Sequence, residues 1–179
     1  SYTREELRIP MREAGPRGLE ALLVRPGAPG KYPLVIISHG TPNKPEDRAR
    51  MTPWTYYPNA MEFARRGWAA AVVMRRGYGD SGGTYAERSP SCDQPDHLRA
   101  SRTAAQDIRS AIAALATRPD IDGSRVLAVG QSTGGLATIA LTANPPPGLI
   151  GAISFAGGRG SKANFVMCDE AGLIAAFQN

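Results

Sequence analysis

Gly130-Gln131-Ser132-Thr133-Gly134 lies between an apolar run at 126–129 and an alanine-rich segment at 136–141. The first segment predicts a short buried strand, and the second predicts the packed face of a helix. A G-x-S-x-G sequence at such a junction is typical of a nucleophile elbow, a turn too tight for side chains at its two glycines. This turn raises the serine hydroxyl to the top of a sheet and points the next backbone N–H groups at the same place. The context favours a nucleophilic Ser132 over a plain tight turn.

The usual partners of a catalytic serine do not follow this turn. Where such an elbow serves catalysis, the triad runs serine, acid, histidine along the chain. The carboxylates after Ser132 are Asp169 and Glu170, whereas His39 and His97 both precede it. We expect Asp169 and Glu170 to be solvated charges in the first turn of a helix. The elbow therefore predicts chemistry that these 179 residues do not complete in the usual way.

The composition is that of one globular domain, with 42% hydrophobic and 21% charged residues. No apolar run approaches the ~18–20 residues that a membrane span needs. The formal net charge of +5 comes mostly from arginines that are interspersed with acidic residues. This charge pattern argues against nucleic acid as a partner, and the lack of a long apolar run argues against a membrane. The oligomeric state stays open.

The two cysteines, Cys92 and Cys168, fit no metal-ligand spacing. They are either two separate thiols or one long-range disulfide. Each follows a predicted strand, and both predicted loops lie at the carboxyl-terminal edge of the sheet, so a bridge across that rim is a hypothesis. Because residue 1 is Ser, removal of a leader also stays open. Two such cysteines and no others, in a chain without an initiator Met, favour an exported protein, periplasmic or secreted, over a cytoplasmic one.

Strand and helix patterns alternate along the chain. An antiparallel hairpin is predicted for 5–9 and 19–24, around a turn region at 15–18. Further strands are predicted at 34–38, 68–74, 126–129 and 150–156, and helices at 58–66, 97–116, 136–141 and 170–177. The alternation predicts an α/β fold, a doubly wound and mostly parallel sheet with the hairpin at one edge. Ligand sites in such sheets lie beyond the carboxyl ends of the strands.

Three motifs give the chain a resemblance to the α/β-hydrolase superfamily, and within it to the dienelactone-hydrolase-like and related esterase or peptidase branch. They are the His-Gly turn 37–42 (ISHGTP), the R-G-x-G-x-S-x-G turn 75–83 (RRGYGDSGG) and the elbow 129–135 (VGQSTGG). The resemblance spans essentially the whole chain but only the amino-terminal part of the family fold. Members continue through two more strands that deliver the triad acid and histidine. We therefore expect 1–179 to be a single hydrolase domain without its carboxyl-terminal part, and to be inactive by itself.

The resemblance implies a serine hydrolase of carboxylic esters, with a small-molecule ester or acyl compound as substrate. Ser132 would attack the acyl carbon and form an acyl-enzyme. The backbone N–H groups of Thr41 and Thr133 would form the oxyanion hole. No metal or organic cofactor is expected. The alternatives are a peptidase or thioesterase on the same scaffold, or a truncated module of this fold without catalytic activity.

Three polar residues outside the elbow invite other assignments. We expect His39 to order the oxyanion loop by hydrogen bonding rather than to act as a general base. His97 is predicted to be a surface or capping histidine. Asp80 is expected to accept backbone N–H bonds within its own glycine-rich turn.

An aromatic cluster follows the oxyanion loop. Trp54, Tyr56 and Tyr57 either line an aromatic or acyl pocket or anchor the helix that follows them. The sequence leaves both interpretations open.

Overall fold

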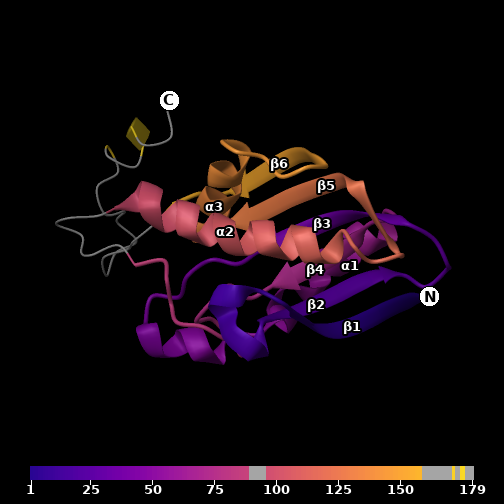
Figure 1. The fold of residues 1–179 in the computed structure, drawn as a ribbon, viewed down its shortest axis with the longest axis horizontal. Coiled ribbons are helices and arrows are strands. Elements are labelled where there is room, and N and C mark those ends of the chain that lie inside the picture. The colour runs from indigo at the N-terminus through magenta and orange to yellow at the C-terminus, as the bar shows by residue number, and fades with distance from the viewer. Residues whose placement is uncertain (89–95, 159–170, 172–173, 176–179) are drawn as a thin grey trace.

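The computed structural model describes residues 1–88, 96–158, 171, 174 and 175. Within these residues the chain forms a mixed sheet of six strands in the order β1-β2-β4-β3-β5-β6, with helices packed on both of its faces (Figure 1). The predicted α/β class is therefore confirmed. None of the described helices has the length and apolar character needed to cross a membrane.

The predicted amino-terminal hairpin is present at one edge of the sheet. Strand β1 (Tyr2–Ile9) pairs antiparallel with β2 (Leu19–Pro26) along its whole length. The connection contains a 3₁₀ segment, Arg12–Arg17, where the sequence predicted only a turn. Gly18 closes this connection with φ 66°, and a Cβ there would lie 2.5 Å from the carbonyl oxygen of Ile9. Only glycine fits this position.

The centre of the sheet is parallel. Strand β3 (Tyr32–Ser38) pairs with β4 (Ala69–Val73) on one side and with β5 (Ile121–Gln131) on the other, and β5 pairs with β6 (Leu149–Phe155). Strand β5 begins five residues earlier than the apolar run predicted, because Ile121 and Asp122 pair with the start of β3 before a bulge. The carboxyl ends of these four strands meet at one edge of the sheet.

The helices cover both faces of the sheet, as the doubly wound prediction requires. Helix α1 (Tyr57–Arg65) packs on one face through alanine and methionine side chains that share a core with β2, β3 and β4. Helices α2 (His97–Leu115) and α3 (Thr133–Thr142) share the core on the other face (Figure 1). The loop between β3 and α1 contains two short 3₁₀ segments, Pro45–Arg50 and Pro53–Tyr56. The last predicted helix, 170–177, lies mostly outside the described residues.

Candidate active site

The backbone turns sharply at Ser132, between the end of β5 and the start of α3. Ser132 has φ 54° and ψ −120°, a left-handed conformation that is uncommon for a residue other than glycine. Such a conformation costs about 1–3 kcal/mol and persists only where neighbouring structure enforces it. The Ser132 N–H donates to the Phe155 carbonyl at 2.9 Å, and the Ser132 carbonyl accepts from the Leu136 N–H at 3.1 Å. The predicted strand–turn–helix junction is confirmed.

Both glycines of the elbow are required by close approach of the backbone. A Cβ on Gly130 would lie 2.1 Å from the carbonyl oxygen of Gly134. A Cβ on Gly134 would lie 2.3 Å from the carbonyl oxygen of Ser38 and 2.4 Å from that of His39. Real Cβ atoms do not come this close to backbone oxygens, so the end of β3 and the first turn of α3 are in contact only because Gly134 lacks a side chain.

Gly134→Ala tests this contact. We expect the substitution to lower the free energy of unfolding by about 1–3 kcal/mol, because the new methyl group must push the elbow away from β3. Gly30→Ala is the matched control, since the nearest atom to its Cβ would be Tyr32 Cζ at 3.5 Å, an ordinary contact. Urea unfolding of both variants measures the difference. Equal midpoints for the two variants would show that the elbow can relax at no cost.

The His-Gly turn after β3 lies directly against the elbow. A Cβ on Gly40 would lie 3.2 Å from Ser132 Cβ and 3.8 Å from Ser132 Oγ. Thr41, the next residue, places its Oγ1 atom 2.8 Å from Thr133 Oγ1. Thr133 is the first residue of α3, where a backbone N–H has no acceptor within the helix. The structure thus brings together the three residues that the sequence selected for the nucleophile and the oxyanion hole.

His39 is buried and serves the shape of this turn. Its Nε2 atom accepts the backbone N–H of Arg75 at 3.0 Å, so the ring proton is on Nδ1, which lies 2.7 Å from the Gly40 carbonyl oxygen. Burial lowers the pKa of His39 well below its ordinary value, and the positive charge of Arg75 lowers it further. The expectation that His39 orders the loop is confirmed. Both ring nitrogens are occupied, which argues against its use as a general base.

The prediction for His97 was wrong. Its side chain is only 5% exposed, on the core-facing side of the first turn of α2. The capping residue of α2 is Asp96, whose carboxylate accepts the backbone N–H of Arg99 at 3.1 Å. The adjacent aspartate therefore provides the cap, and the helical phase turns His97 inward.

The prediction for Asp80 was also wrong. Its exposed carboxylate forms ion pairs with Arg8 and Arg17, which belong to the amino-terminal hairpin and its connection. Arg8 has the largest effect in lowering the pKa of Asp80, and Arg17 lowers it further. The backbone N–H of Asp80 donates to Glu20 Oε1 at 3.1 Å. Asp80 thus joins the glycine-rich turn to the hairpin through contacts between residues far apart in sequence.

The structure separates the aromatic residues into two groups. Trp54 and Tyr57 lie with ring centroids 5.4 Å apart, and both contact β1. Trp54 Nε1 donates to Glu6 at 2.8 Å, and the Tyr57 hydroxyl accepts from Arg4 Nε at 2.5 Å. These two aromatic residues anchor the start of α1 and the segment before it to β1.

Tyr56 faces the elbow. Its hydroxyl accepts a long hydrogen bond from the Gly40 N–H at 3.4 Å and donates to Gln131 Oε1 at 3.2 Å. Of the three predicted pocket residues, Tyr56 is the one with hydrogen bonds to both the His-Gly turn and the elbow. It joins the two segments beside Ser132.

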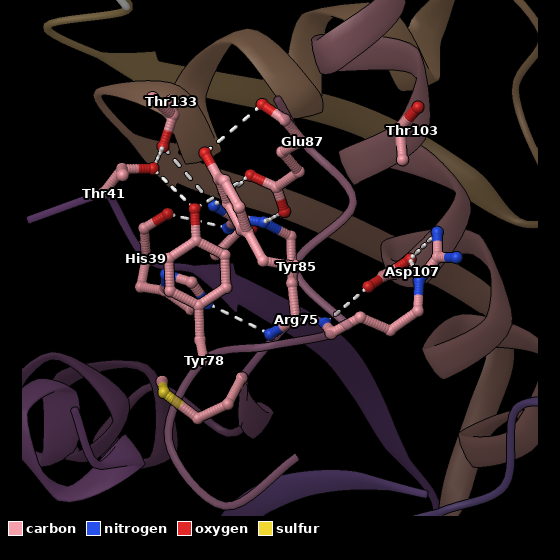
Figure 2. Close-up of polar contacts among 12 residues, drawn as sticks. His39, Thr41, Arg75, Tyr78, Tyr85, Glu87, Thr103, Asp107 and Thr133 are labelled. Carbon is pink, nitrogen blue, oxygen red and sulfur yellow. Dashed lines mark hydrogen bonds and ion pairs between the residues drawn. The ribbon is translucent and has the colours of Figure 1, made fainter. Parts of the chain in front are cut away.

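A buried ion pair beneath these turns was missed by sequence analysis. Arg75 Nε lies 2.6 Å from Glu87 Oε2, and both side chains are almost fully buried, at 1% and 2% exposed (Figure 2). Arg75 Nη1 also donates to Ser38 Oγ and to the His39 carbonyl, each at 2.7 Å. Burial by itself would lower the pKa of Arg75, but the Glu87 carboxylate and Tyr78 outweigh it, so the pKa is raised and Arg75 stays charged. Glu87 follows the glycine-rich turn in an irregular segment, and no pattern in the sequence points to it.

A second buried pair fixes the same turn to α2. The carboxylate of Asp107 accepts the backbone N–H of Arg76 at 2.7 Å and the Arg76 Nη2 at 2.8 Å. Burial raises the pKa of Asp107 even though Arg76 lowers it. The R-G-x-G-x-S-x-G turn is thus held from two directions by charged residues.

Several predicted residues cannot be placed. Cys92, Cys168, Asp169 and Glu170 lie outside the described residues, so the disulfide stays a hypothesis. In the part of the chain that the structure describes, no group of three or more His, Cys, Asp or Glu side chains is arranged to hold a metal ion.

Solved structures share this fold. A protein from Klebsiella pneumoniae described as a dienelactone hydrolase matches with a TM-score of 0.56 and 20% identity over 92% of this chain. An acetyl xylan esterase from Paenibacillus sp. R4 matches with a TM-score of 0.51 and 18% identity over 78% of the chain. An aminopeptidase from a Thaumarchaeota archaeon matches with a TM-score of 0.51 and 23% identity over 87%. The chain spans 64%, 48% and 25% of these three proteins, respectively.

The match to a sequence family is nearly as long as the chain. No curated protein matches significantly. Residues 16–176 match the X-Pro dipeptidyl-peptidase (S15) family, and this range contains all three motifs of the hydrolase resemblance. Together with the elbow between β5 and α3 and the α/β-hydrolase fold of the solved relatives, this match shows that the chain belongs to the S15 family of X-Pro dipeptidyl-peptidases.

Proposed function

We propose that this protein is a serine hydrolase that cleaves carboxylic esters through an acyl-enzyme on Ser132. One observation carries the proposal: Ser132 has a left-handed backbone at the β5–α3 turn and lies against the His-Gly-Thr turn. A strained serine in such a turn is a hydroxyl presented for attack rather than for packing. The acetyl xylan esterase among the solved relatives is consistent with an ester substrate.

The chemistry divides into two acyl transfers. Ser132 Oγ bonds to the acyl carbon, and the negative charge of the tetrahedral intermediate falls on the former carbonyl oxygen. The N–H groups of Thr41 and Thr133 donate to that oxygen, and such donors are typically worth about 3 kcal/mol each in the transition state. The intermediate collapses by expelling the alkoxide, which leaves as the alcohol after taking the proton that the general base removed from Ser132. Water then attacks the acyl-enzyme, releases the acid and restores the Ser132 hydroxyl.

A base must take the proton of Ser132 for this attack to be fast. His39 is engaged at both ring nitrogens and is held neutral by burial, and His97 is enclosed on the core-facing side of α2, so we place the general base outside the described residues. Residues 1–179 by themselves are then expected to be nearly inactive. The oxyanion hole and substrate binding alone can retain about 10³–10⁴-fold acceleration over water.

Peptide bonds are the second candidate substrate, favoured by membership of a peptidase family. The elbow does not separate the two, because the same nucleophile and oxyanion hole serve esters, amides and thioesters. On this alternative, Ser132 would be acylated by the residues preceding the cleaved bond, and an amine would leave in place of an alcohol.

Covalent labelling and a substrate panel test the proposal. We expect a fluorophosphonate to add once to the full-length protein at Ser132, since it reacts with activated serines. A panel of p-nitrophenyl esters, X-Pro p-nitroanilides and acyl thioesters then ranks the substrate classes by kcat/KM, with esters expected first. A preference for X-Pro anilides would select the peptidase. No labelling and no turnover of any class would leave a module of this fold without catalytic activity.

A further inference from the structure

The side chains of Thr41 and Thr133 belong to a closed ring of hydrogen bonds, which is buried except at the half-buried Thr41. Thr133 Oγ1 lies 2.8 Å from Thr41 Oγ1, and Thr41 Oγ1 lies 2.7 Å from the hydroxyl of Tyr78. The Tyr78 hydroxyl donates to Glu87 Oε1 at 3.1 Å. Arg75 Nη2 closes the ring by donating to Glu87 Oε1 at 3.2 Å and to Thr133 Oγ1 at 3.4 Å. Figure 2 shows these five side chains converging between the His-Gly turn and the start of α3.

The two charged members fix the direction of every bond in the ring. A guanidinium only donates, and a carboxylate only accepts. The Tyr78 hydroxyl gives its proton to Glu87, so it must accept from Thr41, and Thr41 must in turn accept from Thr133. Thr133 Oγ1 is left to accept from Arg75. Each hydroxyl therefore donates once within the ring and accepts once, and no alternative arrangement of protons satisfies all five groups.

Burial keeps this arrangement stable. Tyr78 is fully buried, and Thr133 is 3% exposed. Burial raises the pKa of the Tyr78 hydroxyl. The negative charge of Glu87 raises this pKa further, so the phenol keeps the proton that it donates. The Tyr78 ring packs edge-on against His39, with centroids 4.4 Å apart. Water has little access to the bonds that Arg75 and Tyr78 make with Glu87 and Thr133, and a buried group left without its partner would be costly.

We propose that this ring sets the spacing of the two oxyanion donors, and that Tyr78 is its positioning residue. The inference rests on the proposed function of Thr41 and Thr133. Thr41 is in a loop after β3, and Thr133 begins a helix 92 positions later in the chain. The bond between their side chains holds the two residues, and so their N–H groups, at one distance. Tyr78 and Glu87 determine which way that bond points. Oxyanion donors act only when they are placed in advance around the developing charge.

Tyr78→Phe tests the proposal in the full-length protein, because it removes the hydroxyl oxygen and keeps the contact between the aromatic side chain and His39. Loss of one oxyanion donor typically costs about 10²–10³-fold in kcat, and a misplaced donor retains part of its effect. We expect kcat to fall about 10- to 100-fold while KM changes less than about threefold, since the ring affects the transition state more than substrate binding. Affinity for a boronic acid that forms a tetrahedral adduct should fall with kcat.

Tyr85→Phe is the matched control. The Tyr85 ring packs against Tyr78 with centroids 5.6 Å apart, and its hydroxyl donates to the Glu87 backbone carbonyl at 3.3 Å, outside the ring. We expect this variant to retain kcat within about twofold. A fall equal to that of Tyr78→Phe would show a general packing effect and overturn the assignment.

A double-mutant cycle identifies the ring as one unit. Thr133→Val removes the hydroxyl and keeps the backbone N–H, so it opens the same ring at another point. The double variant Tyr78→Phe/Thr133→Val should be about as impaired as either single variant, because the ring can be opened only once. If the loss of kcat in the double variant were the product of the two single losses, the two hydroxyls would act independently and the shared ring would be contradicted. Thr133→Val also replaces Tyr78→Phe as the test if the latter does not fold.

Hydrogen–deuterium exchange separates failure of this proposal from failure of the proposed function. Tyr78→Phe should speed amide exchange in residues 38–41 and 130–135, and Tyr85→Phe should not. This readout needs no turnover. Unchanged exchange in both segments would overturn the positioning role even in an active enzyme, whereas faster exchange in a protein that no fluorophosphonate labels would keep the ring and refute the hydrolase.

Discussion

Ser132→Ala is expected to abolish fluorophosphonate labelling and to lower kcat by about 10⁶-fold, the loss typical of removing a nucleophilic serine. The loss is that large because water has to replace the covalent route entirely. The fold should survive, since Ser132 is only partly buried and alanine adopts its backbone conformation at similar cost. Intact-protein mass after labelling and initial rates on a p-nitrophenyl ester measure the two effects, and thermal unfolding confirms the fold.

Ser110→Ala is the control for this experiment. Ser110 is also partly buried and lies on α2, away from the elbow in sequence. The Ser110→Ala variant should react with the fluorophosphonate and turn over the ester at the same rates as the natural protein. If Ser132→Ala were still labelled at full stoichiometry, another serine would be the nucleophile and the proposed function would need a different site.

Arg75→Met is expected to lower the free energy of unfolding by about 3–5 kcal/mol, because it removes the guanidinium that pairs with the buried carboxylate of Glu87. Arg75 also donates to Ser38 and His39, so several polar groups lose a hydrogen bond together. Arg65→Met is the matched control, since Arg65 pairs with Glu62 at the surface, where each side chain is 55% exposed. Exposed pairs contribute about 0–1 kcal/mol. Urea unfolding of both variants gives the comparison.

Removing both charges distinguishes the ion pair from the volume of the side chains. Arg75→Met/Glu87→Met should recover part of the stability lost in Arg75→Met, because no unpaired charge stays buried. The double variant could instead be less stable than Arg75→Met, by as much as a separate core substitution costs. The hydrogen bonds to the other polar partners would then contribute more to the free energy of unfolding than the ion pair does. If Arg75→Met were as stable as Arg65→Met, water would have to reach Glu87, and its burial in the fold would be wrong.

Local sequence was sufficient for most of the fold. Short apolar runs predicted the strands β3, β4 and β6 within a few residues of their observed ends. Apolar residues at helical spacing did the same for α1 and α2. The beginning of β5 was missed because residues 121–123 include an aspartate and a glycine, which resemble a turn. These residues are in a strand because β3 offers hydrogen bonds to them, which is a property of the neighbouring strand rather than of the segment itself.

The roles of single polar residues were harder to predict, for the same reason. Asp80 and His97 were assigned from their neighbours in sequence, but their environments come from residues far away in the chain or from the phase of a helix. Glu87 drew no attention, although it is the acceptor for Arg75 and Tyr78. A lone carboxylate in an irregular segment carries no signal until the fold encloses it.

The sequence by itself determined the elbow, because glycines at 130 and 134 around a serine are a local requirement of one tight turn. It also determined the parallel strands that bring the glycine-rich ends of β3, β4 and β5 to one edge, since their apolar runs can be buried only between two layers of helices. Only the tertiary structure decided which side chains surround that turn. Thr41, Tyr78, Glu87 and Thr133 meet because three separate loops end at one edge of the sheet, and a hydrogen bond depends on distance in space rather than on distance along the chain.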